Sequence, residues 1–258
     1  MSETRVEARD VVYRVGEKTL VDRVSFSAAA GEFIALIGPN GAGKSTLLEI
    51  VAGRLRPAAG EIRLLGAPID GVSTRDLAIT RAMLGANPPS DIPFAVRTVV
   101  ETGRYPFRGL PEATPDEDTL LVDRAMAMAD VARLADRSYR TLSSGEQARV
   151  MIARVLAQAS PIALLDEPAA SLDAANGERA LQTFSSNLEK ETTVICVLHD
   201  LNQASFYADR IMLMSEGRLV GIGDPREVLQ SEVLSEVYGQ TMKVPDHPFR
   251  GCPLVLMA

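Results

Sequence analysis

The feature that most constrains this chain is a glycine-rich segment that directly follows a short apolar run. Residues 38–45 read GPNGAGKS and fit the phosphate-loop pattern G-x-x-x-x-G-K-[ST]. Residues 33–37 before them are apolar throughout, which is typical of a strand covered on both faces. Glycines let backbone N–H groups face a phosphate chain, and a helix that begins at Lys44 adds the positive end of its dipole. The segment therefore predicts a nucleotide site at the end of a buried strand, in preference to a flexible loop before a helix.

Length and composition exclude several other classes of protein. The 258 residues suggest one or two domains, and 46% apolar with 24% charged residues is typical of a globular chain. The net charge of −7 argues against a protein whose main role is to bind nucleic acid. Two cysteines, Cys196 and Cys252, are too few for a disulfide framework and favour a reducing compartment. The acidic N-terminus does not fit a secretory signal, and no apolar stretch approaches the ~20 residues that cross a bilayer.

Short apolar runs along the chain predict a mixed α/β fold. The expected strands are Val11 to Val15, Val24 to Ala28, Phe33 to Ile37, Ile62 to Leu65, Ile162 to Leu165, Thr193 to Leu198 and Ile211 to Met214. Two positions, Thr114 and Asp224, are each followed by a proline and then by a glutamate three residues on, which predicts a capped helix start. We expect the first of these helices to run to about Ala135 and the second to Tyr238.

A proline-dense segment separates the first group of predicted strands from a mainly helical region. Residues 87–93 read NPPSDIP and cannot continue a helix or a central strand, so they predict a hinge or linker. From Val96 to Gln158 the pattern is mainly helical, and buried-strand runs resume after Pro161. We therefore expect a core in two parts, residues 1–86 and 159–258, with a helical subdomain at 87–158 inserted between them.

Two adjacent carboxylates end another apolar strand. Asp166 and Glu167 follow the run that begins at Ile162. Beside a phosphate loop, Asp166 is suited to hold a metal ion, because a hard cation prefers oxygen ligands. Glu167 is suited to polarise an attacking water, which favours hydrolysis over binding alone. Without the loop, an acidic pair at a strand end would indicate an ordinary surface turn.

A third motif brings in a known family. Residues 142–147 read LSSGEQ and begin a helix, and here the chain resembles the ATPase subunits of ABC transporters, whose signature is usually L-S-G-G-Q. Ser144 replaces the first glycine of that signature, and Glu146 replaces its glutamine. Ser143 and Glu146 also fit a helix capping box, and the two interpretations are compatible, because a capped helix start is also an anion site.

The resemblance extends over nearly the whole chain and implies a fold and a ligand. It implies a P-loop NTPase core of the ABC ATPase type, with an antiparallel β subdomain and an inserted α-helical subdomain, that binds ATP and Mg²⁺. Lys44 would neutralise phosphate charge, and Ser45 and Asp166 would hold the metal. The residues expected around ATP in one copy are Gly38, Pro39, Asn40, Gly41, Ala42, Gly43, Lys44, Ser45 and Thr46.

Four more positions match the family pattern or depart from it. Tyr13 matches the aromatic residue that stacks on adenine, although it also fits a half-buried strand face. Asp173 matches the residue that communicates across a dimer, and also fits a helix N-cap. His199 matches the switch histidine at the γ phosphate. The departure is Ala86, which stands where the family has a glutamine. Asn87 offers an amide one residue later.

By resemblance, two copies pack head to tail, and Ser143, Ser144, Gly145 and Glu146 of one copy face the ATP of the other. Catalysis is assigned to Glu167, His199 and Lys44. The implied partners are a second ATPase subunit, a multi-span permease and, indirectly, a substrate-binding protein, with no nucleic acid. The implied location is the cytoplasmic face of the cell membrane, where the subunit is peripheral.

The cargo is a finer prediction. Residues 93–106 and the tail His247 to Leu254 resemble importers of haem, ferric siderophores and cobalamin, and haem is preferred. The tail is equally compatible with a surface extension that carries no information on the cargo. The alternatives from another class are a soluble ABC ATPase without a transport role and a weakly hydrolysing regulatory subunit.

Overall fold

The computed structural model describes residues 3–86, 89–111, 113–186 and 191–258. Its contacts divide the chain into two units, which are described in turn. The first unit comprises residues 1–72 and 189–258, and the second comprises residues 73–188. Among the described residues, no helix combines the length and apolar character needed to cross a membrane.

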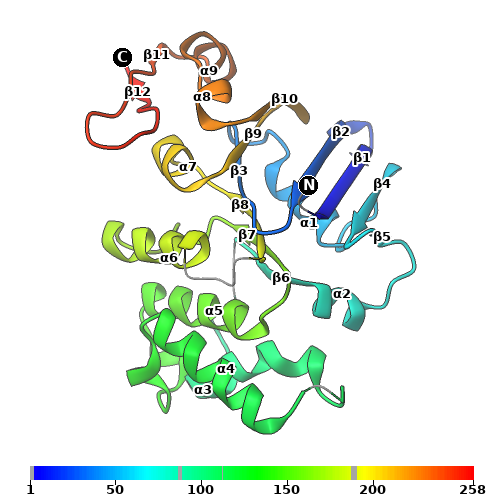
Figure 1. The fold of residues 1–258 in the computed structure, drawn as a ribbon, viewed down its shortest axis with the longest axis vertical. Coiled ribbons are helices and arrows are strands. Elements are labelled where there is room, and N and C mark those ends of the chain that lie inside the picture. Colours follow the sequence, from blue (N-terminus) through cyan, green and yellow to red (C-terminus); the bar gives the residue numbers. More distant parts are fainter. Residues whose placement is uncertain (1–2, 87–88, 112, 187–190) are drawn as a thin grey trace. The chain divides into compact units, whose positions relative to one another are not determined.

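An antiparallel sheet forms the N-terminal part of the first unit (Figure 1). Its strand order is β2-β1-β4-β5, and bulges interrupt the register of β1 with both neighbours. The predicted strands at residues 11–15 and 24–28 are parts of longer strands, because both flanks continue the pairing. The bounds are β1 Thr4–Val15, β2 Lys18–Ala29, β4 Ala59–Leu64 and β5 Ala67–Pro68.

The core of the first unit is a mainly parallel sheet. The central strand β3 (Phe33–Ile37) is buried at every residue and runs parallel to β8 (Thr193–Val197) and β9 (Arg210–Ser215). Strand β10 (Arg218–Gly223) is antiparallel to β9. The continuous apolar runs at β3 and β8 were thus confirmed as buried central strands. The remaining elements are α1 Lys44–Val51, α7 Leu201–Tyr207, α8 Pro225–Val228, α9 Ser231–Tyr238, β11 Met242–Lys243 and β12 Leu256–Met257.

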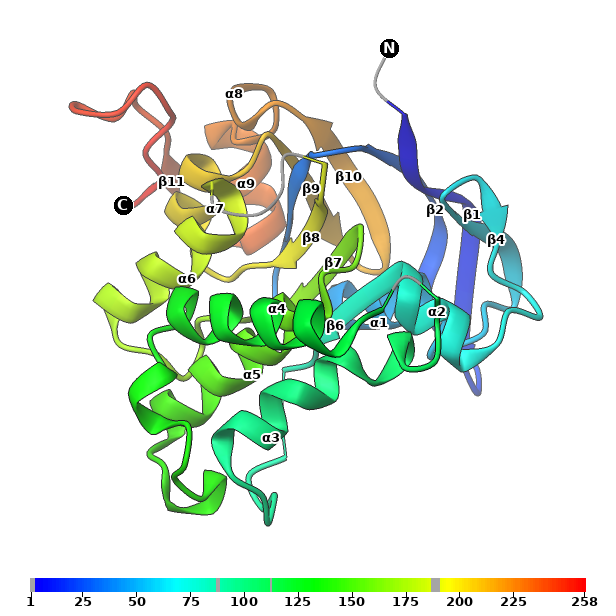
Figure 2. The ribbon, with the colours of Figure 1, turned by 60° about the horizontal axis from the view of Figure 1, so that its bottom comes forward.

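The second unit is mainly helical. It carries one parallel strand pair, β6 (Arg81–Leu84) with β7 (Ile162–Asp166). Helices α4 (Pro115–Met128) and α5 (Ser144–Gln158) pack together, as Figure 2 shows. The other elements are α2 Thr74–Thr80, α3 Val96–Glu101, η1 Thr102–Phe107, η2 Ala132–Leu134, η3 Tyr139–Thr141 and α6 Ala174–Ser186.

Both proline-marked helix starts were confirmed, but both helices end early. Thr114 caps α4 by accepting a hydrogen bond from the backbone N–H of Glu117, and Asp224 forms a capping box in α8. Helix α4 ends at Met128 rather than near Ala135, because Asp130 has a φ of 53° that no α-helix contains. The C-terminal helix is two helices, since the backbone leaves the helical region at Leu229.

The segment around Gly103 has a packing role. A Cβ on this glycine would lie 2.4 Å from the carbonyl oxygen of Arg154 in α5, so only glycine permits this approach. The adjacent Arg104 is 7% exposed and bonds to the carbonyl oxygens of Ala157 and Gln158 and to the carboxylate of Asp118. A guanidinium at the C-terminus of α5 is favourable for the helix dipole. This segment therefore stabilises the helical unit.

Tyr139 provides a test of the core of this unit. The residue is 0% exposed, and its hydroxyl has no hydrogen-bond partner among the described residues. Burial also raises the pKa of its phenol. A buried hydroxyl without a partner pays its desolvation cost uncompensated, so we expect Tyr139→Phe to leave the free energy of unfolding unchanged or raise it by about 1 kcal/mol. Urea unfolding measures this, with exposed Tyr105→Phe as the control. A loss of stability would show that the hydroxyl has a stabilising role.

Candidate nucleotide-binding site

The phosphate loop joins β3 to α1 in the first unit. The side chain of Lys44 is only 6% exposed, and its Nζ donates to the carbonyl oxygens of Gly38 (2.7 Å) and Pro39 (3.0 Å). Lysine is rarely buried to this extent unless its charge is paired. An ammonium group held against carbonyl oxygens gains energy when a phosphate oxygen offers a full negative charge. Among the other predicted residues of the loop, Asn40, Gly41 and Ser45 are exposed.

The backbone of the loop fits a phosphate group. Gly38 and Gly43 have φ values of +144° and +96°. A Cβ on Gly38 would lie 2.1 Å from the carbonyl oxygen of Met214, and one on Gly43 would lie 2.3 Å from that of Leu20. Glycine alone tolerates both the backbone angle and the close approach. In the described part of the chain no side chain caps α1, so the backbone N–H groups of its N-terminal turn can bind an anion.

His199 reaches the same sheet edge as the loop. Strands β3 and β8 are parallel neighbours with Leu36 paired to Val197, and the N–H of Leu198 donates to the carbonyl of Leu36. The phosphate loop and the exposed His199 therefore both follow the carboxyl ends of adjacent strands, where ligands of such sheets bind. Asp200, the next residue, caps α7. Tyr13 is half-buried in β1, as its strand interpretation predicted.

The acidic pair lies at the end of β7 in the second unit. Asp166 is the last residue of this strand and is 5% exposed. Glu167 follows with a φ of 54°, a left-handed conformation that is unfavourable for a residue with a Cβ. Its carbonyl accepts a hydrogen bond from the N–H of Ala170. Strain of this kind persists where the surrounding fold imposes it, and such positions cluster at active sites. The carboxylate and hydroxyl oxygens of Asp166 and Ser45 are of the chemical type that Mg²⁺ prefers.

The signature segment forms the predicted capping box. The hydroxyl of Ser143 accepts from the N–H of Glu146 (3.3 Å), and a carboxylate oxygen of Glu146 accepts from the N–H of Ser143 (3.0 Å). The backbone N–H and the hydroxyl of Ser143 both donate to the Glu146 carboxylate, and these two bonds hold the pKa of Glu146 below its ordinary value. Ser144 is exposed and Gly145 half-buried. The helix start thus carries a negative charge at the position where the family has a neutral glutamine.

Asp173 takes the N-cap geometry that was its alternative interpretation. Its carboxylate accepts from the backbone N–H (2.9 Å) and the side-chain amide (2.8 Å) of Asn176 in α6. These bonds lower its pKa. Folding lowers the pKa of both Asp173 and Glu146, so the two caps stabilise the chain at neutral pH and lose that contribution in acid, as the carboxylates protonate. Gly145 lies near the loop that precedes α6, because a Cβ on Gly145 would be 3.5 Å from the carbonyl oxygen of Ser171 in that loop.

The position at which the sequence departs from the family pattern lies just after β6. Ala86 is exposed two residues after that strand, and its side chain has no polar group that could contact a metal ion or water. Asn87, the possible replacement, lies outside the described residues.

Sequence reasoning missed one residue of the first unit. Tyr238, the last residue of α9, is half-buried in this unit. Burial raises the pKa of its phenol to about 12, and the backbone of Gly38 in the phosphate loop opposes that rise. No motif signals Tyr238, because it lies far from the phosphate loop in the chain.

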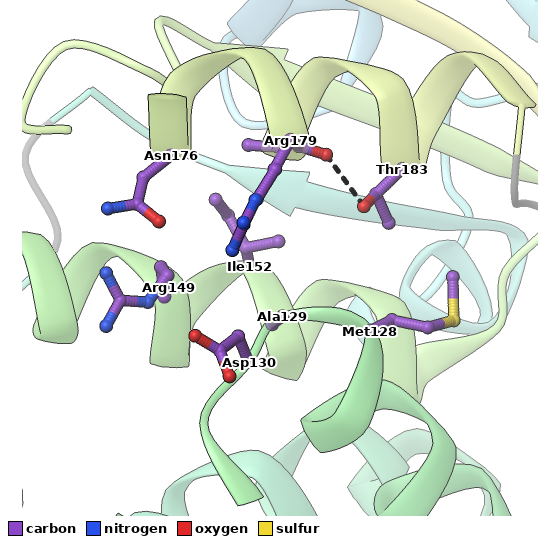
Figure 3. A pocket seen from close by; sticks show the side chains of 9 residues that line it. Met128, Ala129, Asp130, Arg149, Ile152, Asn176, Arg179 and Thr183 are labelled. Atoms are coloured by element: carbon purple, nitrogen blue, oxygen red, sulfur yellow. Dashed lines mark hydrogen bonds between the residues drawn. The ribbon is translucent and has the colours of Figure 1, made fainter. Parts of the chain in front are cut away.

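A pocket in the second unit contains none of the predicted site residues. It lies between the end of α4, α5 and α6, and the side chains of Arg149, Arg179 and Asp130 line it (Figure 3). The Nε atom of Arg149 is buried without a hydrogen-bond partner among the described residues. We assign this pocket no part in nucleotide binding.

Known proteins resemble this chain over most of its length. The family model described as ABC transporter matches residues 21–170. The chain is 47% identical over 239 residues to the hemin import ATP-binding protein HmuV of Nocardia farcinica (strain IFM 10152), covering 93% of this chain and 82% of that protein. It is 39% identical over 259 residues to the protein of the same name from Escherichia coli O157:H7, covering 98% and 99%.

Solved structures share the fold. The structure of cbiO1 from Clostridium perfringens, part of the ABC transporter complex cbiONQ, has a TM-score of 0.77 at 26% identity and covers 91% of this chain and 94% of that one. The dimeric structure of MJ0796, a bacterial ABC transporter cassette, has a TM-score of 0.75 at 28% identity and covers 85% and 98%. The α/β cassette fold expected from the sequence is thereby confirmed.

Proposed function

This chain belongs to the ABC transporter family as an ATPase subunit, and on that premise we propose that it powers the import of haem across the cytoplasmic membrane. The observation that carries the proposal is the identity of 39% to 47% with hemin import ATP-binding proteins over nearly the whole chain. The buried Lys44 and the glycine cradle supply the chemistry, because they suit a polyphosphate and not an organic cargo.

In this proposal, each predicted residue has its own role in ATP hydrolysis. Lys44 and the backbone of residues 38–46 hold the phosphates of ATP. Ser45 and Asp166 would hold Mg²⁺, which when bound neutralises charge on the phosphates. Glu167 orients the attacking water and accepts its proton, and His199 stabilises the γ phosphate as charge develops on it. Tyr13 stacks on the adenine ring.

A second copy of the chain completes the arrangement in this proposal. Residues 143–146 of one copy would face the γ phosphate held by the other, so that a helix N-terminus meets developing negative charge. Asp173 would relay the state of one site to the other across the dimer. The dimer would bind a multi-span permease at the cytoplasmic face of the membrane, and the permease would receive haem from a substrate-binding protein.

ATP-dependent uptake by the transporter reconstituted in proteoliposomes tests the cargo. We expect haem to accumulate and to stimulate ATP hydrolysis, with no uptake of a ferric siderophore or cobalamin. Uptake of either of these in place of haem would replace the proposed cargo while keeping the ATPase. The exposed Ala86 at the end of β6 favours a second candidate, a weakly hydrolysing regulatory subunit, and a negligible rate of ATP turnover in the same vesicles would favour it.

Glu146 offers a test of the signature segment. Its carboxylate would lie close to the partner's γ phosphate, and like charges repel. Glutamine keeps the capping box, so Glu146→Gln is expected to raise the ATPase rate of the transporter about twofold to fivefold. The gain should be constant from pH 6 to 8, because Glu146 with its lowered pKa stays ionised there. The control is Glu117→Gln, at the equivalent position of α4. An equal rate in both variants would contradict the trans assignment.

A further inference from the structure

Strands β9 and β10, labelled in Figure 1, are joined by a tight turn whose glycine is buried. Its central residues, Glu216 and Gly217, have φ values of 48° and 79°, and positive φ at both positions is typical of a type I′ hairpin turn. The hairpin between β4 and β5 has the same pattern at Leu65 and Gly66, with φ values of 50° and 76°. Gly66 is exposed, whereas Gly217 is buried. The turn at Gly217 therefore packs against other parts of the first unit.

The buried glycine contacts the phosphate loop. The backbone N–H of Gly217 donates to the carbonyl oxygen of Ala42 (3.1 Å), a buried residue in the middle of the loop. The strand that leads into the turn also approaches the loop, since a Cβ on Gly38 would lie 2.1 Å from the carbonyl oxygen of Met214. The end of β9 and the turn after it thus lie against the loop at two points.

The same glycine contacts β2. Its carbonyl oxygen accepts a hydrogen bond from the backbone N–H of Asp22 (2.8 Å), and a Cβ on Gly217 would lie 2.9 Å from the carbonyl oxygen of Leu20. That carbonyl oxygen also lies against Gly43 of the phosphate loop, where a Cβ would be 2.3 Å from it. Gly217 therefore joins the loop to this stretch of β2 through its two backbone polar groups.

This stretch of β2 is also the neighbour of Tyr13. In the antiparallel register of β1 and β2, Tyr13 is paired with Val21, the residue between Leu20 and Asp22. The residue proposed to stack on adenine and the loop proposed to hold the phosphates are thus attached to the same three residues of β2. A ligand that must reach both binds best when their separation is fixed before it arrives, because less conformational freedom is then lost on binding.

From these contacts we propose that Gly217 is a positioning residue for the nucleotide: it fixes the phosphate loop relative to Tyr13, so that the phosphates and the base of one ATP molecule are bound together. Gly217 would act through Ala42 and β2 and would not touch the nucleotide. Glycine is required here, because a side chain would combine an unfavourable φ with too close an approach to the Leu20 carbonyl. The inference rests on the proposed assignment of the loop and Tyr13 to ATP.

The test compares Gly217→Ala with Gly66→Ala in the full chain. Both variants place alanine at nearly the same positive φ, so the backbone strain is similar, but a Cβ on Gly66 would meet nothing within 4 Å. We expect Gly217→Ala to raise the dissociation constant for ATP, and the KM of the assembled transporter, by about fivefold to tenfold with kcat unchanged, as for the loss of one hydrogen bond. Gly66→Ala should change neither. Inorganic tripolyphosphate, which has no base to reach Tyr13, should bind Gly217→Ala nearly as tightly as the wild type.

A second variant and a second measurement do not depend on backbone strain at the glycine. Arg218, the next residue, forms an ion pair with Asp22 (2.7 Å), and Arg218→Gln should weaken ATP binding by about twofold while sparing tripolyphosphate. In the nucleotide-free chain, the amide of Asp22 donates to the turn, so its hydrogen exchange should be faster in Gly217→Ala than in Gly66→Ala.

Several outcomes would overturn the inference. Equal losses of ATP and tripolyphosphate affinity in Gly217→Ala would mean that the turn orders the loop alone. Unchanged ATP affinity in this variant, unchanged exchange at Asp22, or an equal loss of ATP affinity in Gly66→Ala would also contradict it. If Gly217→Ala does not fold, the two affinities of Arg218→Gln decide. Lys44→Ala should lose both ligands, and if it retained them the proposed nucleotide site would be wrong instead.

Discussion

Replacing Glu167 by glutamine is expected to lower the kcat of ATP hydrolysis by about 10²-fold to 10⁴-fold, which is the usual contribution of a general base. Glutamine has nearly the size of glutamate and can still hydrogen-bond a water molecule, but it cannot accept the proton of that water. The affinity for ATP should be unchanged, because the proposed contacts of the phosphates are with Lys44 and the loop backbone. Steady-state hydrolysis and equilibrium ATP binding measure the two effects separately.

The chain contains a matched control for this experiment. Glu216 has a φ of 48°, close to the 54° of Glu167, and lies exposed in the turn between β9 and β10. Glu216→Gln therefore makes the same chemical change at a residue of similar φ and should keep the wild-type rate. Hydrolysis that persists in Glu167→Gln would contradict its assignment as the base. Equal loss in both variants would indicate a nonspecific effect of removing a carboxylate.

Lys44→Ala should raise the dissociation constant for ATP by at least about 100-fold, because charge-assisted hydrogen bonds to the phosphates are lost. The ammonium group is also buried against the carbonyls of Gly38 and Pro39, and alanine cannot replace those bonds. Titration with ATP, followed by calorimetry, measures the change, and circular dichroism verifies that the fold is retained.

The control for the lysine is Lys243→Ala. This lysine is exposed in β11, so its removal should leave ATP affinity unchanged. If Lys44→Ala bound ATP as tightly as Lys243→Ala does, the phosphate loop would not be the nucleotide site.

Much of the fold was predictable because its signals are local. The buried strand at residues 33–37 and the capped helix starts at Thr114 and Asp224 are each encoded by a few neighbouring residues, and each was confirmed. The end of α4 was not predictable in the same way. Apolar residues continue beyond Met128, and the helix ends through the left-handed backbone of Asp130, a residue with no strong helix-stop preference.

The candidate site likewise has parts that the local sequence predicts and parts that only the fold reveals. The order of residue types in a dozen positions was enough to predict the phosphate loop, the acidic pair at the end of β7 and the capping box at Ser143, because each motif is a contiguous piece of backbone with one favourable conformation. The close approach of Gly38 to Met214 and the attachment of Val255 to Asn202 came only from the folded chain. Those contacts join residues far apart in sequence, and a hydrogen bond between distant residues leaves no periodicity, spacing or composition in the chain from which it could be read.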